Sequence, residues 1–197
     1  MTHPAAVVQR SLYLLADTSG STTRGGFSGG WHLALPRLVA LAESLGPGHR
    51  ISLLTYGDDA SLRVPLTGAS QLAMIPLMPP AGLSSLAAGL RLLARVVRQD
   101  RQQLRSDGIA DAKVALIVAD GLPTDADEVL LEARAGLDPH AVGLHLVAPP
   151  GEDREDRLAL AALRATLYPL RTGDAGRIAD SIVAAAGAAL TGSGGPQ

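Results

Sequence analysis

The sequence predicts an α/β fold with three layers, in which helices cover both faces of a doubly wound, mostly parallel sheet with one antiparallel edge strand. Three apolar runs without polar alternation, residues 11–16, 113–119 and 142–148, are typical of strands buried on both faces. Helical patterns lie between these runs along the chain. Strands that alternate with helices favour an open, doubly wound sheet similar to the Rossmann fold.

A fourth apolar run, residues 50–56, is followed after Gly-Asp-Asp-Ala by residues 61–66. This short spacing predicts a hairpin whose second strand lies antiparallel at a sheet edge.

Five helices are expected between and after the strands. The clearest is residues 84–99, where leucines recur with helical spacing and arginines point away from them. The others are expected at residues 33–45, with a start or a kink at Pro36, and at residues 125–134, 153–167 and 174–190. We interpret Asp125 as a cap of the helix that follows it.

Composition favours one globular domain, expected over residues 10–190 with flexible termini at 1–9 and 191–197. The chain has 197 residues, of which 47% are hydrophobic and 18% charged. A net charge of −2 gives no reason to expect nucleic acid or an anionic membrane as a partner. The absence of cysteine excludes disulfides and thiolate metal sites. We expect a soluble, cytoplasmic protein with no membrane span.

Oxygen-bearing side chains follow two of the predicted strands. Asp17 ends the first strand and is followed by Ser19 and Ser21. Asp120 ends the apolar run that begins at Lys113, the only lysine. Ligands of open α/β sheets bind at the carboxyl ends of the strands. Ser84, at the start of a predicted helix, completes a candidate site of five residues.

These residues predict a site for a hard divalent cation. Carboxylates and hydroxyls without histidine or cysteine select a hard cation, Mg²⁺ first and otherwise Mn²⁺ or Ca²⁺, over zinc or copper. Alternation in an extended segment allows Ser19 and Ser21 to point the same way as Asp17. Because Mg²⁺ usually keeps several waters, an open coordination position is expected.

The order of these motifs resembles the von Willebrand factor type A (VWA) domain family over roughly residues 10–190. The metal-ion-dependent adhesion site (MIDAS) of that family has a D-x-S-x-S motif, a threonine in a G-G-T-like loop, and an aspartate in a "TDG" or "ADG" turn. Asp17, Ser19, Ser21 and Asp120 match it. Ser84 stands in the place of the threonine and lacks the methyl group that restricts a threonine rotamer, so a weaker metal affinity is expected. The adjacent serine is a possible substitute.

The resemblance implies a binding module without enzymatic activity. In such domains the hydroxyls touch the metal, one or both aspartates act through water, and the last position accepts an Asp or Glu carboxylate from a partner protein. The stretches "DTSGS" and "VADGLPTD" look closest to the bacterial tellurium-resistance (TerY-like) type. That likeness implies a role in tellurium or stress resistance.

Two alternatives remain open. The stretch "GFSGG" satisfies the nucleophile elbow G-x-S-x-G, which makes Ser28 a candidate nucleophile of a serine esterase with Asp120 and His145 or His140. The elbow needs a strand that runs into its serine, however, and the nearest predicted strand ends at Asp17. The other alternative is a metal-free scaffold protein with a degenerate site.

The glycines of "GFSGG", residues 26–30, are interpreted as a mobile loop beside the candidate metal site. Trp31 is expected in the core, whereas Phe27 is a candidate exposed contact for a partner. Arg24 is interpreted as a solvated loop residue that could also receive a partner carboxylate.

Overall fold

The fold is built around one sheet of six strands. The computed structural model describes residues 9–46, 48–74, 80–106, 111–121, 123–149 and 163–192. The strands are β1 (Gln9–Asp17), β2 (Arg50–Tyr56), β3 (Ala60–Gly68), β4 (Asp111–Val118), β5 (Gly143–Ala148) and β6 (Thr166–Pro169). They follow the order β3-β2-β1-β4-β5-β6, and every neighbouring pair except β2 and β3 is parallel.

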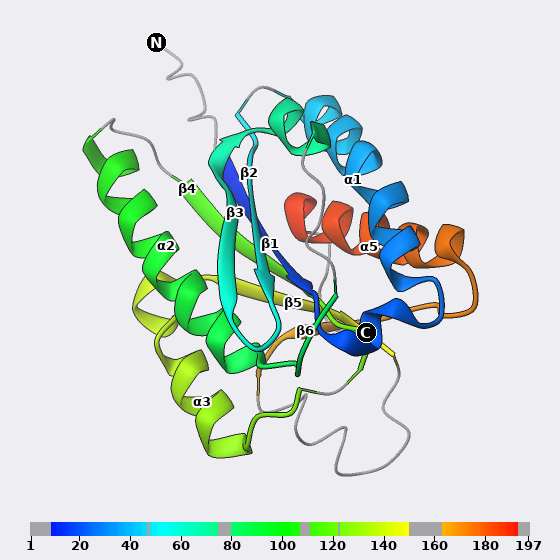
Figure 1. Ribbon diagram of the computed structural model, residues 1–197. Coiled ribbons are helices and arrows are strands. Elements are labelled where there is room, and N and C mark those ends of the chain that lie inside the picture. The colour runs from blue at the N-terminus through cyan, green and yellow to red at the C-terminus, as the bar shows by residue number, and fades with distance from the viewer. Residues whose placement is uncertain are drawn as a thin grey trace.

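Helices cover both faces of this sheet (Figure 1). The α-helices are α1 (Phe27–Ser44), α2 (Leu86–Ser106), α3 (Asp127–Ala135) and α5 (Ala175–Thr191). Short 3-10 helices are η1 (Gly20–Thr23), η2 (Ala69–Met74) and η3 (Asp138–His140). Figure 1 shows α1 and α5 together on one face and α2 and α3 on the other. The predicted three-layer α/β fold with an antiparallel edge strand is confirmed.

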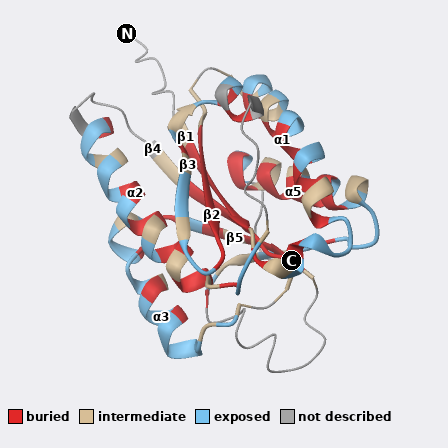
Figure 2. Ribbon diagram, viewed as in Figure 1, coloured by how far each residue is buried: buried red, intermediate tan, exposed pale blue. Residues whose placement is uncertain are grey.

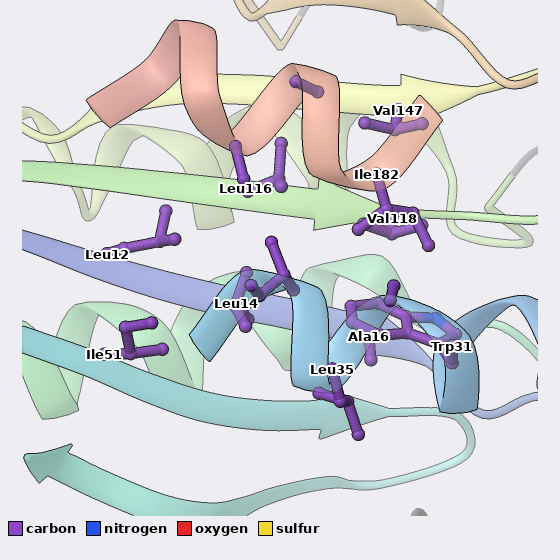
Figure 3. Packing of buried hydrophobic residues seen from close by; sticks show 14 of the residues in the cluster. Leu12, Leu14, Ala16, Trp31, Leu35, Ile51, Leu116, Val118, Val147 and Ile182 are labelled. Carbon is purple, nitrogen blue, oxygen red and sulfur yellow. The ribbon is translucent and has the colours of Figure 1, made fainter. Parts of the chain in front are cut away.

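The central strands are buried on both faces, as their continuous apolar runs predict (Figure 2). In β1, Leu12 and Leu14 belong to the core layer under α1 and α5, whereas Tyr13 and Leu15 belong to the layer under α2 and α3. Figure 3 shows the first layer, where Trp31 of α1 packs near Ala16. Trp31 is fully buried, which confirms its expected place in the core.

The order of the strands fixes the position of the candidate site. The chain leaves β1 toward β2 and β3, and then returns to the other side of β1 to form β4. The direction of winding therefore reverses between β1 and β4. Such a switch point leaves a crevice beyond the carboxyl ends of the two strands. Asp17 ends β1 and Asp120 follows β4, so both carboxylates lie at this crevice.

The glycine-rich segment differs from its prediction. Helix α1 begins at Phe27, not at residue 33, so the expected mobile loop is instead the first turn of a helix. Pro36 lies inside this helix and does not start it. Phe27 is only 3% exposed, which excludes it as an exposed partner contact. The reason is packing: Gly30 brings the backbone of α1 against Ile178 of α5.

Other differences lie at the ends of elements. Most of the expected helix 153–167 falls outside the described residues. Its described part, residues 163–167, is not helical: residues 163–164 form a turn, and the last two residues belong to β6, which pairs with β5. Helix α2 continues to Ser106, seven residues beyond its expected end. Strand β1 already includes Gln9 and helix α5 still includes Thr191, so regular structure extends one residue into each expected flexible terminus.

The two outer strands of the described sheet are irregular or short. The pairing of β3 with β2 contains two register shifts, and Pro65 lies within β3. Strand β6 has four residues and ends in Pro169. Proline and bulges are typical of edge strands, because an edge has no second neighbour to receive its N–H groups.

The contact between α1 and α5 yields a test of packing. A Cβ atom on Gly30 would lie 2.2 Å from Ile178 Cγ2, whereas a Cβ on Gly187 of α5 would meet only Leu41 Cδ2 at 3.8 Å. We expect Gly30→Ala to lower the free energy of unfolding by about 1 to 3 kcal/mol through overpacking. Gly187→Ala, the matched control, gains helix propensity and is expected to stabilise the chain by up to about 1 kcal/mol. Urea unfolding measures both, and a Gly30→Ala chain as stable as the native one would contradict the packing.

Candidate metal centre

Asp17 is the buried centre of the candidate site. Its side chain is 2% exposed, at the carboxyl end of β1. Oδ1 accepts a hydrogen bond from the backbone N–H of Ser19 at 2.8 Å, and Oδ2 accepts one from Ser84 Oγ at 2.9 Å. A buried carboxylate is costly unless such donors compensate it. Asp17 therefore joins the loop after β1 to the segment before α2.

The two serines after Asp17 extend this network to Asp120. Ser21 Oγ donates to Asp120 Oδ1 at 3.0 Å, and Ser19 Oγ lies 3.0 Å from Ser21 Oγ. Because Ser21 uses its only proton for Asp120, Ser19 is the donor in the pair of serines. Helix η1 holds both side chains in place, since buried Thr22 donates its hydroxyl to the Ser19 carbonyl at 2.7 Å.

Ser84 and Ser85 have different roles, and the structure brings Ser84 to the site. Ser85 Oγ donates to Asp125 Oδ1 at 2.8 Å and accepts from the N–H of Ala88 at 3.3 Å, so it caps α2. Asp125 Oδ2 also accepts from the N–H of Ala87, at 3.0 Å. The expectation that Asp125 caps the following helix is therefore wrong: it supports the start of α2, and Ala126 is the N-cap position of α3.

A further carboxylate, which the sequence analysis missed, holds the loop that carries Ser84. Asp58, after β2, accepts from the N–H of Leu83 at 2.7 Å. Gly82 has a φ of +73°, and a Cβ there would lie 1.8 Å from Asp58 Oδ2, so only glycine fits. The signal available in the sequence was an acidic pair after a buried strand together with a glycine two residues before Ser84.

Backbone hydrogen bonds connect the same loops. The N–H of Gly20 donates to the Gly82 carbonyl at 3.0 Å, and the N–H of Ser85 donates to the Gly57 carbonyl at 3.0 Å. On the other side, Thr124 donates both its N–H and its hydroxyl to the Ser84 carbonyl. All five predicted site residues are thus brought together, on loops that support one another.

The electrostatics of the site favour a cation. None of the ion pairs found among the described residues involves Asp17 or Asp120. Burial raises the pKa of the Asp120 carboxyl; the hydrogen bond from Ser21 partly offsets this rise and the charge of Asp17 adds to it. Burial also raises the pKa of the Tyr56 hydroxyl well above its ordinary value, with further contributions from Asp17 and Asp120. Two carboxylates therefore share a poorly solvated site without a positive partner.

The spacing of the oxygens fits a small divalent cation. Ligands at about 2.0 to 2.1 Å in an octahedron place neighbouring oxygens about 3.0 Å apart. The three side-chain pairs of the network, Ser84 with Asp17, Ser19 with Ser21, and Ser21 with Asp120, are separated by 2.9, 3.0 and 3.0 Å. No group of three or more His, Cys, Asp or Glu side chains in the described ranges is placed to hold a metal. The candidate donor set here has two carboxylates, and the other three donors are hydroxyls.

The surroundings of Ser28 and His145 lack the local geometry of a serine esterase. Ser28 lies in the first turn of α1, after η1 and two glycines with positive φ, and not at the end of a strand. Its hydroxyl donates to the Thr22 carbonyl at 3.2 Å. His145, on β5, lies 3.1 Å from the Tyr168 hydroxyl through Nδ1, and its ring stacks on that tyrosine. Each side chain thus has a local structural partner.

Comparison with known families identifies the fold. The sequence pattern described as "von Willebrand factor type A domain" matches residues 11–168, which is more than half of the chain. The chain therefore belongs to the VWA domain family. A comparison with curated protein sequences gives no match. Within the described ranges, every helix is too short or too polar to span a lipid bilayer.

Solved structures share this fold at low sequence identity. A von Willebrand factor type A protein from Catenulispora acidiphila is 17% identical, with a TM-score of 0.69 over 93% of this chain and 43% of that protein. The SpRpn10 VWA domain is 15% identical, with a TM-score of 0.60 over 88% of this chain and 85% of that domain. A manganese-loaded TRAP protein from Plasmodium vivax is 17% identical, with a TM-score of 0.54 over 80% of this chain and 63% of that protein. At these identities the likeness concerns the fold.

The raised pKa of Asp120 predicts a pH effect in the absence of metal. At pH values between the ordinary pKa of 3.8 and the raised pKa of Asp120, the folded chain binds the carboxyl proton more tightly than the unfolded chain does. The free energy of unfolding therefore falls as the pH rises through this range. In EDTA, we expect Asp120→Asn to raise the unfolding temperature at pH 7 and to change it little at pH 4.

The matched control for this experiment is Asp127→Asn. Asp127 is an exposed carboxylate in the first turn of α3, where the helix dipole favours negative charge. Its replacement is expected to destabilise by about 0.3 to 1 kcal/mol. Destabilisation by Asp120→Asn at pH 7, or an equal gain at both pH values, would contradict the electrostatic description of the site.

Proposed function

We propose that this VWA domain holds a divalent cation of the MIDAS type and binds, through it, a carboxylate of another protein. Asp17, Ser19, Ser21, Ser84 and Asp120 are the proposed ligands, directly or through water. The observation that carries the proposal is a set of side-chain oxygens 2.9 to 3.0 Å apart, in which Ser84 pairs with Asp17, and Ser21 pairs with both Ser19 and Asp120. The backbone N–H of Ser19, which donates to Asp17 Oδ1 at 2.8 Å, joins the two groups.

The donor set supports Mg²⁺ first, with Mn²⁺ and Ca²⁺ as alternatives, because all donors are hard oxygens. A bound cation would supply the positive charge that the two carboxylates lack and would attract a third carboxylate from outside. The loops around the site expose side chains to solvent. Leu83 is 65% exposed on one side of the site, and Arg24 is exposed on the other. A partner segment therefore has both an apolar and a cationic contact beside the site.

The chemistry favours binding without turnover. The site contains no histidine, and each of its three hydroxyls already takes part in a hydrogen bond with another member of the site. A nucleophile would need a base to remove its proton. The manganese-loaded TRAP protein is a metal-bound member of the same fold, which supports a cation here. A role in tellurium or stress resistance, and a location in the cytoplasm, stay predictions.

Thermal unfolding tests the cation. At about 100 times its dissociation constant, a ligand stabilises the folded state by about 2.7 kcal/mol, which corresponds to about 5 °C or more for a chain of this size. We expect Mg²⁺ or Mn²⁺ to raise the unfolding temperature relative to EDTA in the native chain and to have no effect on Asp17→Ala. No shift with Mg²⁺, Mn²⁺ or Ca²⁺ would favour the metal-free scaffold instead.

Two adjacent serines provide a matched pair for the same measurement. Ser84→Ala removes a proposed ligand, so its unfolding temperature is expected to be insensitive to the cation. Ser85→Ala removes the cap of α2 and is expected to cost about 1 kcal/mol while it keeps the full cation shift. Loss of the shift in Ser85→Ala with retention in Ser84→Ala would contradict the assignment of the ligands.

A further inference from the structure

A hollow of about 230 Å³ adjoins the candidate metal centre and shares Ser21 and Asp120 with it. Its remaining wall is formed by Arg24, Gly25, Phe27, Leu170, Thr172 and Ile178. The hollow thus lies between the start of α1, the segment after β6 and the start of α5. None of its remaining wall residues belongs to the proposed cation ligands.

The floor of the hollow is apolar and firmly held. Phe27, Leu170 and Ile178 are 3%, 3% and 1% exposed, so only a small part of each side chain faces the hollow. The N–H of Leu170 donates to the Ala148 carbonyl at 2.8 Å, and Ile178 packs against Gly30. Because these residues belong to the core, the floor cannot collapse to fill the space.

The rim of the hollow is polar and open. Arg24 and Thr172 are exposed, and a Cβ added to Gly25 would meet no other part of the molecule within 4 Å. An occupant would therefore enter from solvent, with a carboxylate site on one side and a guanidinium on the other. The five N–H donors of an arginine suit the main-chain carbonyls of an extended peptide.

The volume sets the size of the occupant. A cavity of roughly 150 Å³ lined by leucine, isoleucine and phenylalanine accepts a benzene molecule. The hollow is larger and has the same types of floor residue, so it has room for a large aliphatic or aromatic side chain. A charged group that reached the apolar floor would lose hydration there, because the charged residues of the hollow, Arg24 and Asp120, lie at its sides.

We propose that the hollow receives an apolar side chain of the same partner segment whose carboxylate occupies the metal centre. The partner is then recognised as an acidic residue with a leucine-sized or phenylalanine-sized residue next to it. This inference rests on the proposed function for the acidic residue and on the hollow for the apolar one.

Short peptides test the two halves separately. The probes are the capped peptides Gly-Gly-Asp-Leu-Gly-Gly and Gly-Gly-Leu-Asp-Gly-Gly, with a Gly-Gly-Asp-Gly-Gly-Gly control, each titrated in Mg²⁺ and in EDTA. The chain has six isoleucines, so methyl NMR can follow Ile178 in the hollow and Ile51 in β2 as an internal reference. We expect one leucine order to bind about tenfold or more tightly than the control, because it buries a leucine side chain. That peptide is expected to shift the Ile178 methyl signals but not those of Ile51.

A filled hollow provides the variant control. Thr172→Trp places a large side chain in the hollow from an exposed rim position, and we expect it to abolish the preference for leucine while it leaves binding of the control peptide unchanged. Leu167→Trp adds the same side chain at an exposed position of β6 that does not line the hollow, and we expect no change in either affinity.

Each outcome decides one half. Two results would overturn the hollow as an apolar subsite: equal affinities for the leucine and glycine peptides in Mg²⁺, or a preference for leucine that persists in Thr172→Trp. In either case the proposed function survives if EDTA lowers the affinity of both peptides. A leucine preference that is unchanged by EDTA supports the hollow and overturns the cation. Absence of binding by all peptides at millimolar concentration overturns both.

Discussion

The buried carboxylate of Asp17 is the constraint on which the arrangement of the site depends. It ends the central strand of the sheet, where a charged group has almost no access to water. Its two hydrogen bonds, from the Ser19 backbone and the Ser84 hydroxyl, compensate for the hydration that it loses there. The positions of the loop after β1 and of the segment before α2 follow from this requirement, and the crevice between β1 and β4 is lined accordingly.

Other aspartates hold the surrounding loops in the same way, by accepting hydrogen bonds from the backbone. Asp58 satisfies the backbone of Leu83, and Asp125 satisfies the start of α2 through Ala87 and Ser85. In each case an aspartate from one loop accepts from the backbone of a segment that is distant in sequence. Donors at the start of a helix have no partner inside the helix, so such acceptors position it as well as stabilise it. The candidate metal centre is thereby positioned by the fold itself and not by its five proposed ligands alone.

The sequence predicted the sheet and the five polar residues because both depend on local patterns. Continuous apolar strands and a terminal Asp17 can be recognised one segment at a time. The errors arose where distant segments meet. Helix α1 begins at Phe27 because Gly30 lies against Ile178. Asp125 supports the start of α2 at Ala87, 38 residues earlier in the sequence, because the loop after β4 crosses to that helix. Strand β6 went unpredicted since four residues that end in a proline give almost no periodic signal. The hollow beside Asp120 combines three segments, and no single stretch indicates it.

The two outer strands of the sheet determine how this domain can associate. Each of them carries a proline, β3 is paired with irregular register, and β6 is only four residues long. A further strand from another molecule would find a short ladder at β6 and an irregular one, with Pro65 inside it, at β3. Lateral growth of the sheet from either of these strands is therefore disfavoured. The proposed binding site lies elsewhere, at the loop end of the sheet, so partner binding and sheet extension would not compete for the same edge.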